Sequence, residues 1–579
     1  MDSANSMESP PKYEASITPK DLEFEFNLFK TQLDSPTSQA SPKSPIQTPF
    51  TSLEKIDNEL RAFVVVETLP AWSPTRQEWF IMVSLSIISL MVALDTTILV
   101  GVLPSMAADL GGSSVDTFWT GTSYLLTSAV FQPVIASISE TLGRQQLLLF
   151  SLFLFTIGSA MCGFAPSFQV MLGGRCIQGV GGGGIITLTQ VIFCDIVPLR
   201  QRPTYFAMVL GTWSIGTILG PVIGGLITEN TSWRWVFWIN FPFCGLGLIL
   251  AIVFVKLNSM AKLTLIEKLK RTDWIGAVLF IGGVTSALIG ISWAGTQYSW
   301  TSPQVLVPLI IGLVTVVAFV FWERHVAPHS LLPISIFYCS SALAAFYCAF
   351  ANGLVLLVAL YYFPFYAMSV RGATAIKAGI DFFPCLFLCL PGSVMVAALT
   401  TRLGRFRWAI WIGWVIITIG SGLFILFDTN LKKPVMIAAQ AVLGIGVGMV
   451  LTSVNVGVQA ISKEEDSAMS ASMYGFMRSL GMPVGIALGG TIFQNAMSAK
   501  LDSFHMPTSI AHDSESYVYE LRRMTDGIEK TNILESYAHG FRGVFIFMTA
   551  VAGSGLLASL FIKKFNMNKA LVSKYSART

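Results

Sequence analysis

Residues 169–193 read QVMLGGRCIQGVGGGGIITLTQVIF, and Arg175 is the only charged residue among them. A helix rises about 1.5 Å per residue, so a helix over this stretch is long enough to cross the roughly 30 Å hydrocarbon core of a bilayer. A soluble helix of this length would carry charged residues on its water-facing side, and this stretch does not. The stretch therefore predicts a membrane-spanning helix.

Apolar stretches of similar length recur along the whole chain. Apolar residues make up 53% of the sequence, and Asp, Glu, Lys and Arg together make up 12%, about half of the charged share of soluble domains. So little charge cannot cover the surface of a soluble protein of 579 residues. We therefore expect an all-α polytopic membrane protein. Fourteen spans are predicted, at residues 80–103, 118–138, 146–164, 169–193, 204–228, 235–256, 274–294, 304–322, 341–363, 376–400, 408–427, 434–460, 468–494 and 541–562.

The quoted stretch returns later in the chain. Residues 175–183 (RCIQGVGGG) align with residues 440–448 (QAVLGIGVG) at an offset of 440 − 175 = 265. Residues 142–144 (LGR) align with residues 403–405 (LGR) at a similar offset, 404 − 143 = 261. Duplicated halves around a central pathway are typical of secondary transporters, whose binding site lies near mid-membrane between the halves.

The repeat and the composition divide the chain into five parts. The first is rich in Ser, Pro and charge, and it cannot bury enough apolar surface to fold. The two helices between the halves have no counterpart in the repeat. We expect a disordered cytoplasmic tail (1–75), an N-terminal six-helix half (78–257), a linker with two extra transmembrane helices (258–325), a C-terminal six-helix half with a long outer loop (326–562, loop 496–540) and a cytoplasmic tail (563–579).

Lys and Arg gather on one side of the predicted membrane. Cytoplasmic loops carry an excess of these residues, and the loops on the side of the N-terminus hold most of them, including Arg144, Arg200 and Arg202. Both termini are therefore expected in the cytoplasm. Asn230 begins a glycosylation sequon in a short outer loop, although its closeness to the membrane disfavours its use.

The sequence lacks the signals of ATP, cofactor or metal chemistry. No GxxxxGK[ST] motif occurs, and no loop is long enough for a nucleotide-binding domain. Residues 179–184 match GxGxxG, but they lie within an apolar helix and follow no strand, so we interpret them as helix-packing glycines. The eight cysteines show neither CxxC nor metal-like spacing. We predict no cofactor, no metal, no enzymatic activity and no nucleic-acid partner.

Two charges lie deep within predicted spans, where charged residues are costly and usually functional. Asp95 lies about 22 Å from the start of its helix, and Arg175 about 9 Å from the outer end of its own, so both reach a similar depth in the outer half of the membrane. They are candidates for proton coupling, and the alternative is a purely structural ion pair. Candidates for the lining of a central cavity are Gln178, Asn352, Gln440 and Arg478.

These motifs resemble the major facilitator superfamily, and in particular its fourteen-helix drug:proton antiporter branch. The resemblance covers about residues 78–562. It rests on LDTTILVGVLP at residues 94–104, on ASISETLGR at 136–144 and on GTILGPVIGG at 216–225. It implies the major facilitator fold, with two six-helix pseudo-repeats plus two linker helices.

The resemblance also implies roles for individual residues. Residues 136–144 are similar to the family's gating loop, with Glu140, Gly143 and Arg144 as its functional positions, although Ala136 and Glu140 stand where Gly and Asp are usual. Arg175, Gln178 and Gly179 match the helix 4 motif thought to serve proton transfer. The helix 5 antiporter motif is matched at Gly216, Gly220, Pro221, Gly224 and Gly225.

The antiporter motif favours export of small amphipathic compounds, such as toxins, secondary metabolites and drugs, in exchange for protons. The Ser/Pro-rich tail resembles that of fungal members with this activity. We expect a monomer in the plasma membrane. Two alternatives stay open: proton-coupled uptake or vacuolar transport of a siderophore or amino acid, and a non-transporting receptor built on a transporter scaffold.

Overall fold

The computed structural model describes residues 72–99, 102–111, 114–257, 264–295, 297–328 and 330–569. Most of the tail predicted over 1–75 lies outside these residues, as do 570–579 of the C-terminal tail and Val100 and Gly101 of the first-helix motif. The described residues belong to one compact unit, which begins at Trp72. Within it every element is helical apart from an isolated bridge between Ala294 and Tyr298.

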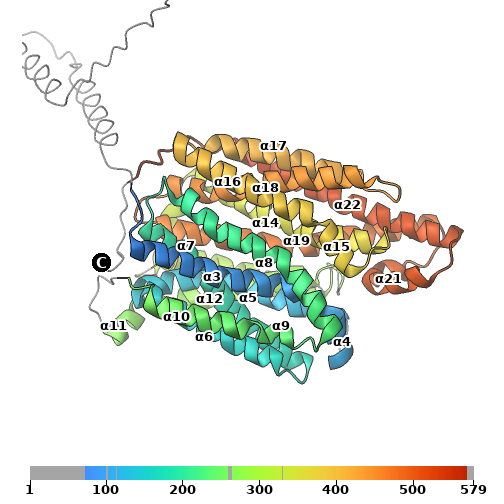
Figure 1. Cartoon of the computed structure of the whole chain (residues 1–579), viewed down its shortest axis with the longest axis horizontal. Coiled ribbons are helices and arrows are strands. Elements are labelled where there is room, and N and C mark those ends of the chain that lie inside the picture. Colours follow the sequence, from blue (N-terminus) through green and yellow to red (C-terminus); the bar gives the residue numbers. More distant parts are fainter. Residues whose placement is uncertain are drawn as a thin grey trace, which may run out of the picture. The chain divides into compact units, whose positions relative to one another are not determined.

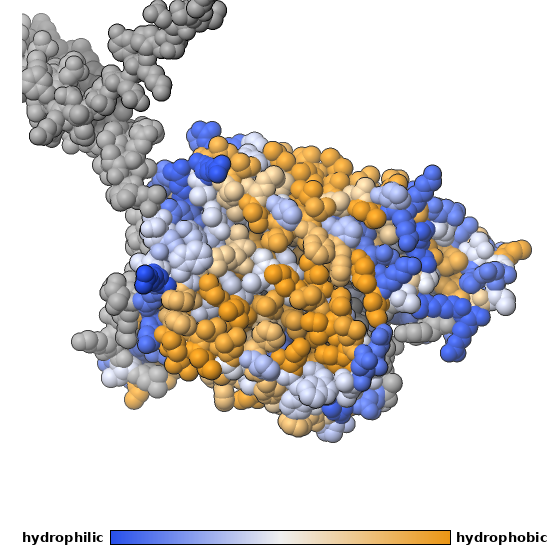
Figure 2. Space-filling view, in the orientation of Figure 1, coloured by the Kyte–Doolittle hydropathy of each residue, from blue (hydrophilic) through white to orange (hydrophobic). Residues whose placement is uncertain are grey.

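Fourteen helices of the described part are long and apolar enough to cross a membrane, which confirms the predicted all-α architecture. Figure 1 shows them running side by side, and Figure 2 shows a broad apolar band between two polar ends. They are α3 (Arg76–Ile98), α5 (Ser114–Leu142), α6 (Arg144–Gly163), α7 (Phe168–Ile196), α8 (Arg202–Asn230), α9 and α10 (Trp235–Trp238, Asn240–Val253), α12 (Trp274–Trp293), α13 (Pro303–His325), α14 (Ser340–Ser369), α15 and α16 (Ala375–Asp381, Phe383–Leu403), α17 (Arg407–Phe424), α18 (Lys433–Ile461), α19 (Ser467–Ser503) and α22 (Ile528–Ser559).

The helix bounds repeat at the offsets found in the sequence. Helix α7 spans 168–196 and α18 spans 433–461, so both bounds differ by 433 − 168 = 265. Helix α5 spans 114–142, and α15 with α16 spans 375–403, so both bounds differ by 375 − 114 = 261. The repeat is therefore a repeat of structure as well as of sequence.

The turns repeat as well, because each half places glycine where the backbone is left-handed. Gly143 (φ 113°) separates α5 from α6, and Gly404 (φ 62°), at an offset of 404 − 143 = 261, separates α16 from α17. Gly111 (φ 65°) and Gly372 (φ 63°) form a second such pair at 372 − 111 = 261. A residue with a Cβ rarely adopts these angles, so the same glycine is needed twice.

Equivalent positions of the two halves touch each other at one end of the bundle. The Cys194 thiol lies 3.5 Å from Oε1 of Gln459, and 459 − 194 = 265. Arg202 donates to Ser467 Oγ at 2.6 Å, and 467 − 202 = 265. Helix α5 packs on α19 while α8 packs on α16, so repeat-related helices exchange partners. The halves thus face each other across an approximate twofold axis.

The two extra helices, α12 and α13, form a hairpin that lies against both halves. Helix α12 packs on α5 and on α19. Phe280 contacts Phe476 of α19 with ring centroids 5.3 Å apart, and Trp293 contacts Trp119 of α5 at 6.3 Å. The hairpin therefore covers the seam between α5 and α19.

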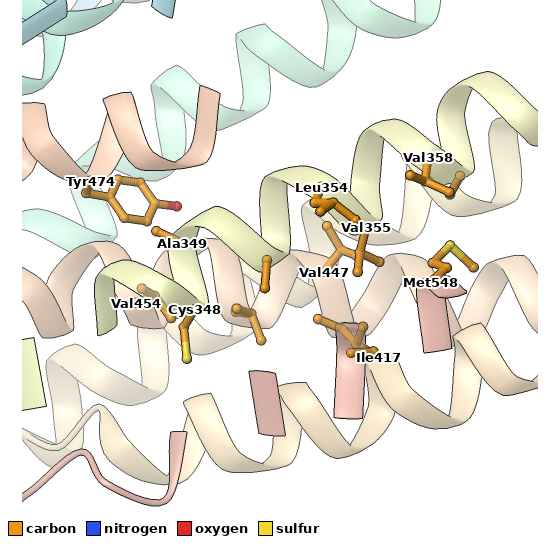
Figure 3. Close-up of a cluster of buried hydrophobic side chains, with 14 of the residues drawn as sticks. Cys348, Ala349, Leu354, Val355, Val358, Ile417, Val447, Val454, Tyr474 and Met548 are labelled. Atoms are coloured by element: carbon orange, nitrogen blue, oxygen red, sulfur yellow. The ribbon is translucent and has the colours of Figure 1, made fainter. Parts of the chain in front are cut away.

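A large apolar core fills the space between α14, α17, α18 and α22. Figure 3 shows Val355 and Val358 of α14 together with Val447 of α18, Ile417 of α17 and Met548 of α22, all fully buried. This core holds the C-terminal half together as a rigid support for the residues that face the other half.

The outer loop expected over 496–540 is largely helical, which differs from the prediction. Helix α19 continues to Ser503, α22 begins at Ile528, and between them lie α20 (Ser509–His512) and α21 (Ser514–Arg523). Ile510, Ala511, Val518 and Leu521 are buried there. Polarity alone suggested a loop, but these spaced apolar residues anchor the segment to the bundle.

Candidate functional site

The carboxylate of Asp95 is fully buried in α3 and forms an ion pair with Arg175 of α7. Oδ2 of Asp95 lies 2.9 Å from Nη1 of Arg175, and the two side chains are 0% and 1% exposed. The two deep charges singled out in the sequence therefore meet. A buried pair of this kind needs further hydrogen bonds to offset the loss of hydration.

Those further bonds come from two amides. Gln178 donates to Oδ1 of Asp95 at 2.8 Å, and Asn240 of α10 donates to the same oxygen at 2.6 Å. Ser159 Oγ of α6 accepts from Gln178 at 2.9 Å and from Asn240 at 3.3 Å. Gln178, expected in the cavity lining, thus belongs to the network around Asp95, which joins α3, α6, α7 and α10.

Arg175 is held on every side. Nε donates to the carbonyl of Thr120 at 3.1 Å, Nη1 also donates to Gln178 Oε1 at 2.6 Å, and the guanidinium lies 4.3 Å from the ring centroid of Tyr124. These contacts fix the plane of the guanidinium against α5. Asn240, Ser159, Thr120 and Tyr124 were not among the candidates singled out in the sequence.

The glycines of α7 allow this close approach. A Cβ at Gly179 would lie 2.6 Å from the Tyr124 carbonyl oxygen, and one at Gly183 would lie 2.2 Å from that of Ser128. On the opposite face, a Cβ at Gly181 would lie 2.5 Å from the backbone nitrogen of Phe155. The GxGxxG match therefore reflects contacts between helices, as the sequence analysis predicts.

The stretch of α8 that resembles an antiporter motif packs against α3, the helix that carries Asp95. A Cβ at Gly216 would lie 2.8 Å from Ala93 Cβ, one at Gly220 would meet the Thr97 side chain, and one at Gly224 would lie 2.2 Å from the Ile98 carbonyl oxygen. Small residues of this kind let the backbones of two helices approach closely.

Pro221 and Gly225 lie on another face of α8. A Cβ at Gly225 would lie 3.4 Å from Ile376 Cδ1, and a Cβ at Gly379 would lie 3.9 Å from Pro221 Cβ. Ile376 and Gly379 belong to α15 of the C-terminal half. Helix α8 therefore contacts the Asp95 helix on one face and the opposite half on the other.

In the gating loop, the main carboxylate partner of Arg144 is Asp195 of α7. Arg144 Nε lies 3.1 Å from Asp195 Oδ2, whereas Arg144 Nη2 lies 3.7 Å from Glu140 Oε1. Arg144 and Asp195 are 3% and 8% exposed, and Glu140 is 37% exposed. Arg144 also donates to the Ala136 carbonyl and to Ser139. Asp195 was missed in the sequence because it lies at the end of an apolar stretch.

The same end of the bundle is closed by contacts between the halves. Arg202 donates to Gln459 Oε1 at 2.8 Å and to Ser467, while its other nitrogens bind the carbonyls of Val197 and Cys194. The cavity beside this contact holds about 20 Å³, room for a single water. A cavity of this size has no room for an organic substrate, and the contacts of Arg202 join the two halves at this end.

Unpartnered polar atoms gather toward the C-terminal half. Gln440 is fully buried with neither amide atom hydrogen-bonded, Oδ1 of Asn352 has no partner, and neither has Nε of Arg478. Asn352 donates weakly to the Val447 carbonyl at 3.5 Å. Buried polar atoms are normally satisfied, so these three cavity candidates stand out among the described residues by their unused hydrogen-bonding capacity.

Two glutamines of the N-terminal half extend this polar surface. Gln132 of α5 donates to Ser479 of α19 at 3.1 Å, and Oε1 of both Gln132 and Gln190 is buried without a partner. Both side chains lie near Gly475 of α19. Neither glutamine was among the cavity candidates singled out in the sequence.

At the opposite end, an exposed ion pair fastens α4 (Leu103–Leu110) to the turn before α9. Asp109 accepts from Arg234 at 2.8 Å and from the Trp233 indole at 2.9 Å. The hydrogen bond from Arg234, and then that from Trp233, lowers the pKa of Asp109 below its ordinary value. The sequon residue Asn230 is exposed nearby, and its amide donates to the Leu226 carbonyl at 2.8 Å.

Comparisons with known proteins agree with this geometry. A sequence model of the Major Facilitator Superfamily matches residues 85–486. The chain is 42% identical to MFS transporter L2 of Phoma sp., over 84% of this chain and 82% of that one. It is 31% identical to efflux pump FUS6 of Gibberella fujikuroi, over 86% and 91%.

Two solved structures share the fold. The human organic anion transporter MFSD10 matches with a TM-score of 0.52 at 15% identity, covering 85% of this chain and all of that one. The proton:xylose symporter XylE matches with a TM-score of 0.52 at 13% identity, covering 84% and 96%.

Proposed function

The chain belongs to the Major Facilitator Superfamily and is a multi-pass membrane transporter of small molecules, and from this premise we propose that it exports small amphipathic organic compounds in exchange for protons. The observation that carries the proposal is the buried network around Asp95. Asp95 is a titratable group, and it lies on α3, the helix that packs against α8. Among the relatives, the pump FUS6 is named for efflux, which supports the outward direction.

The network offers a site where one proton changes many contacts. Asp95 accepts hydrogen bonds from Arg175, Gln178 and Asn240. A proton on the carboxylate removes the charge that strengthens all three bonds, since bonds to an ionised acceptor are about twice as strong as neutral ones. The hold of α7 and α10 on α3 then weakens.

Helix α8 carries this change toward the other half. The glycine face of α8 lies against α3, while Pro221 and Gly225 lie against α15. A shift of α3 therefore moves the contact between the halves. Since a proline in a helix lacks a backbone donor, Pro221 gives α8 a point at which to bend.

We place the substrate between the halves, beside the unpartnered polar atoms of Gln132, Gln190, Asn352, Gln440 and Arg478. A few polar groups in an otherwise apolar cavity suit amphipathic molecules, which have both polar and apolar parts. We also propose that the end closed by Arg202 faces the cytoplasm of a plasma-membrane protein with both termini inside, because that end carries most of the basic residues.

The test compares cells that express the chain with cells that do not. Intracellular accumulation of a panel of fluorescent amphipathic dyes and toxins is measured with and without a protonophore. Export predicts lower accumulation in expressing cells, and loss of that difference when the proton gradient collapses. Higher accumulation in expressing cells would favour uptake, and an unchanged level with every compound would contradict export of this class.

Two variants then locate the proton. Asp95→Asn keeps the shape and removes the charge, and we expect it to abolish gradient-driven export. Asp502→Asn removes an exposed carboxylate near the end of α19 and serves as the matched control. Full gradient-driven export by Asp95→Asn at equal surface expression would leave the Asp95–Arg175 pair a structural one.

A further inference from the structure

A basic cavity opens at the end of the bundle where Arg202 joins the two halves. Its volume is about 380 Å³, and its lining includes Arg200, Gly404, Arg405, Lys564, Asn566 and Asn568. Three of these residues are cations, two are amides, and none of the residues that line the cavity is acidic. Within the described part of the chain, the three cations form no ion pair with a carboxylate.

Three separate segments build this cavity. Arg200, which follows α7, donates to the carbonyls of Thr401 and Arg402 at 3.0 and 3.2 Å and to Asn568 Oδ1 at 3.2 Å. All the acceptors of Arg200 are neutral, so its charge is not cancelled. Gly404, in the turn between α16 and α17, brings the backbone close to the Arg200 guanidinium.

The segment after α22 completes the wall and is firmly held. Ile562 and Met567 are 1% and 0% exposed. The backbone nitrogen of Lys563 donates to Ser341 Oγ at 3.0 Å, and Lys569 donates to the Ala460 carbonyl at 2.6 Å. Lys564, Asn566 and Asn568 thus line the cavity from a segment whose neighbouring residues are anchored to the bundle.

The chemistry of this lining suits a phosphate group. Guanidinium and ammonium donors bind phosphate oxygens with short, charge-assisted hydrogen bonds, and side-chain amides supply further donors. The cavity lies where α7, α16 and α22 end, so it lies beyond the membrane-spanning parts of these helices. Basic pockets at this level are where anionic headgroups meet membrane proteins.

We propose that this cavity binds a phosphate monoester, as carried by an anionic lipid headgroup or by a soluble phosphate. Arg200 belongs to the N-terminal half, Arg405 belongs to the C-terminal half, and Lys564 lies in the segment that follows α22. A phosphate held between them is bound best while the two halves meet at this end. Its binding therefore stabilises the state in which this end is closed.

The proposal is tested on the full-length protein, purified in a neutral detergent. The probes are dioctanoyl phosphatidylinositol 4-phosphate, inositol 1,4-bisphosphate and inorganic phosphate, with dioctanoyl phosphatidylcholine as the neutral lipid. Binding is measured by native mass spectrometry and by the shift in Tm. We expect saturable binding of a phosphate monoester probe. Binding of the phosphoinositide alone identifies a lipid headgroup, and equal binding of the soluble probes identifies a soluble phosphate.

The double variant Arg405→Gln/Lys564→Gln is expected to weaken this binding roughly tenfold or more, because each Lys or Arg near a lipid surface contributes appreciably to anion binding. Lys270→Gln/Arg271→Gln removes the same charge from exposed positions at the end of α11 (Leu265–Lys270) and should leave binding unchanged. Arg405→Lys/Lys564→Arg should retain it, which separates charge loss from misfolding. Equal weakening by both glutamine pairs, or binding of the neutral lipid as tightly as the phosphoinositide, overturns the proposal.

Discussion

Arg144 and Asp195, which are 51 residues apart in sequence, form a buried ion pair with 3.1 Å between Nε and Oδ2. Removal of one member of a buried pair leaves the other charge without compensation, at a cost of about 3–5 kcal/mol. We therefore expect Asp195→Asn to lower Tm and to reduce transport severely. Glu140→Gln, at a more distant and half-exposed position, should have a small effect. Thermal denaturation of both purified variants checks this, and equal losses would show that Glu140 holds Arg144 as strongly as Asp195 does.

The contact of Arg202 with Gln459 and Ser467 should control the closed end. Arg202→Gln cannot reach all four of the present acceptors, so we expect the protein to open more often there. Cys194 lies beside this contact and is buried. In a variant with the other seven cysteines replaced, its labelling by a maleimide should become several-fold faster. An unchanged labelling rate would mean that other contacts keep the end closed.

Close packing of α8 on α3 should not tolerate a single added methyl group. A Cβ at Gly224 would lie 2.2 Å from the Ile98 carbonyl oxygen, whereas one at Gly211 of the same helix would meet nothing within 4 Å. Overpacking typically costs about 1–3 kcal/mol. Gly224→Ala is therefore expected to lower Tm and export, while Gly211→Ala is neutral or slightly stabilising because alanine favours helix. Similar Tm values for the two variants would contradict the close packing described here.

Arginine should be required at position 175 for its shape as well as its charge. Arg175 uses Nε for Thr120 and Nη1 for Asp95 and Gln178, and a single ammonium group cannot serve both directions. Arg175→Lys is expected to lose most of its export at normal surface expression, measured as dye accumulation. Arg271→Lys, at an exposed position, provides the control. Retention of export by Arg175→Lys would reduce the role of Arg175 to that of a point charge.

The sequence predicted the features that recur regularly along the chain, namely the membrane spans and the repeat of the two halves. Fourteen spans follow from length and hydropathy, and the offset between the two halves appears again in the bounds of α7 and α18. Asp95 and Arg175 were found because a charge in an apolar stretch is conspicuous. Asn240 and Gln132 are equally buried, but they were not singled out in the sequence as Gln178, Asn352 and Gln440 were. The three-dimensional contacts reveal them.

Partner choice was harder to predict than position. Arg144 was assigned to the gating loop from its motif, yet Asp195 comes from the far end of another helix. Gln178 was expected in the cavity lining and, from the resemblance, in a motif for proton transfer, and its side chain donates to Asp95. In both cases the partner depends on the rotation of one helix against another, which periodicity along a single helix does not specify.

The pairing of Arg202 with Ser467 at equivalent repeat positions also bears on how such a chain can arise. In a dimer of identical subunits, a residue on the twofold axis faces its own copy. Two arginines would repel each other there, so an isologous dimer could not place a guanidinium at this point. Fusion of the two copies into one polypeptide allows the two equivalent positions to differ. The second position can then be Ser467, whose hydroxyl accepts a hydrogen bond from Arg202.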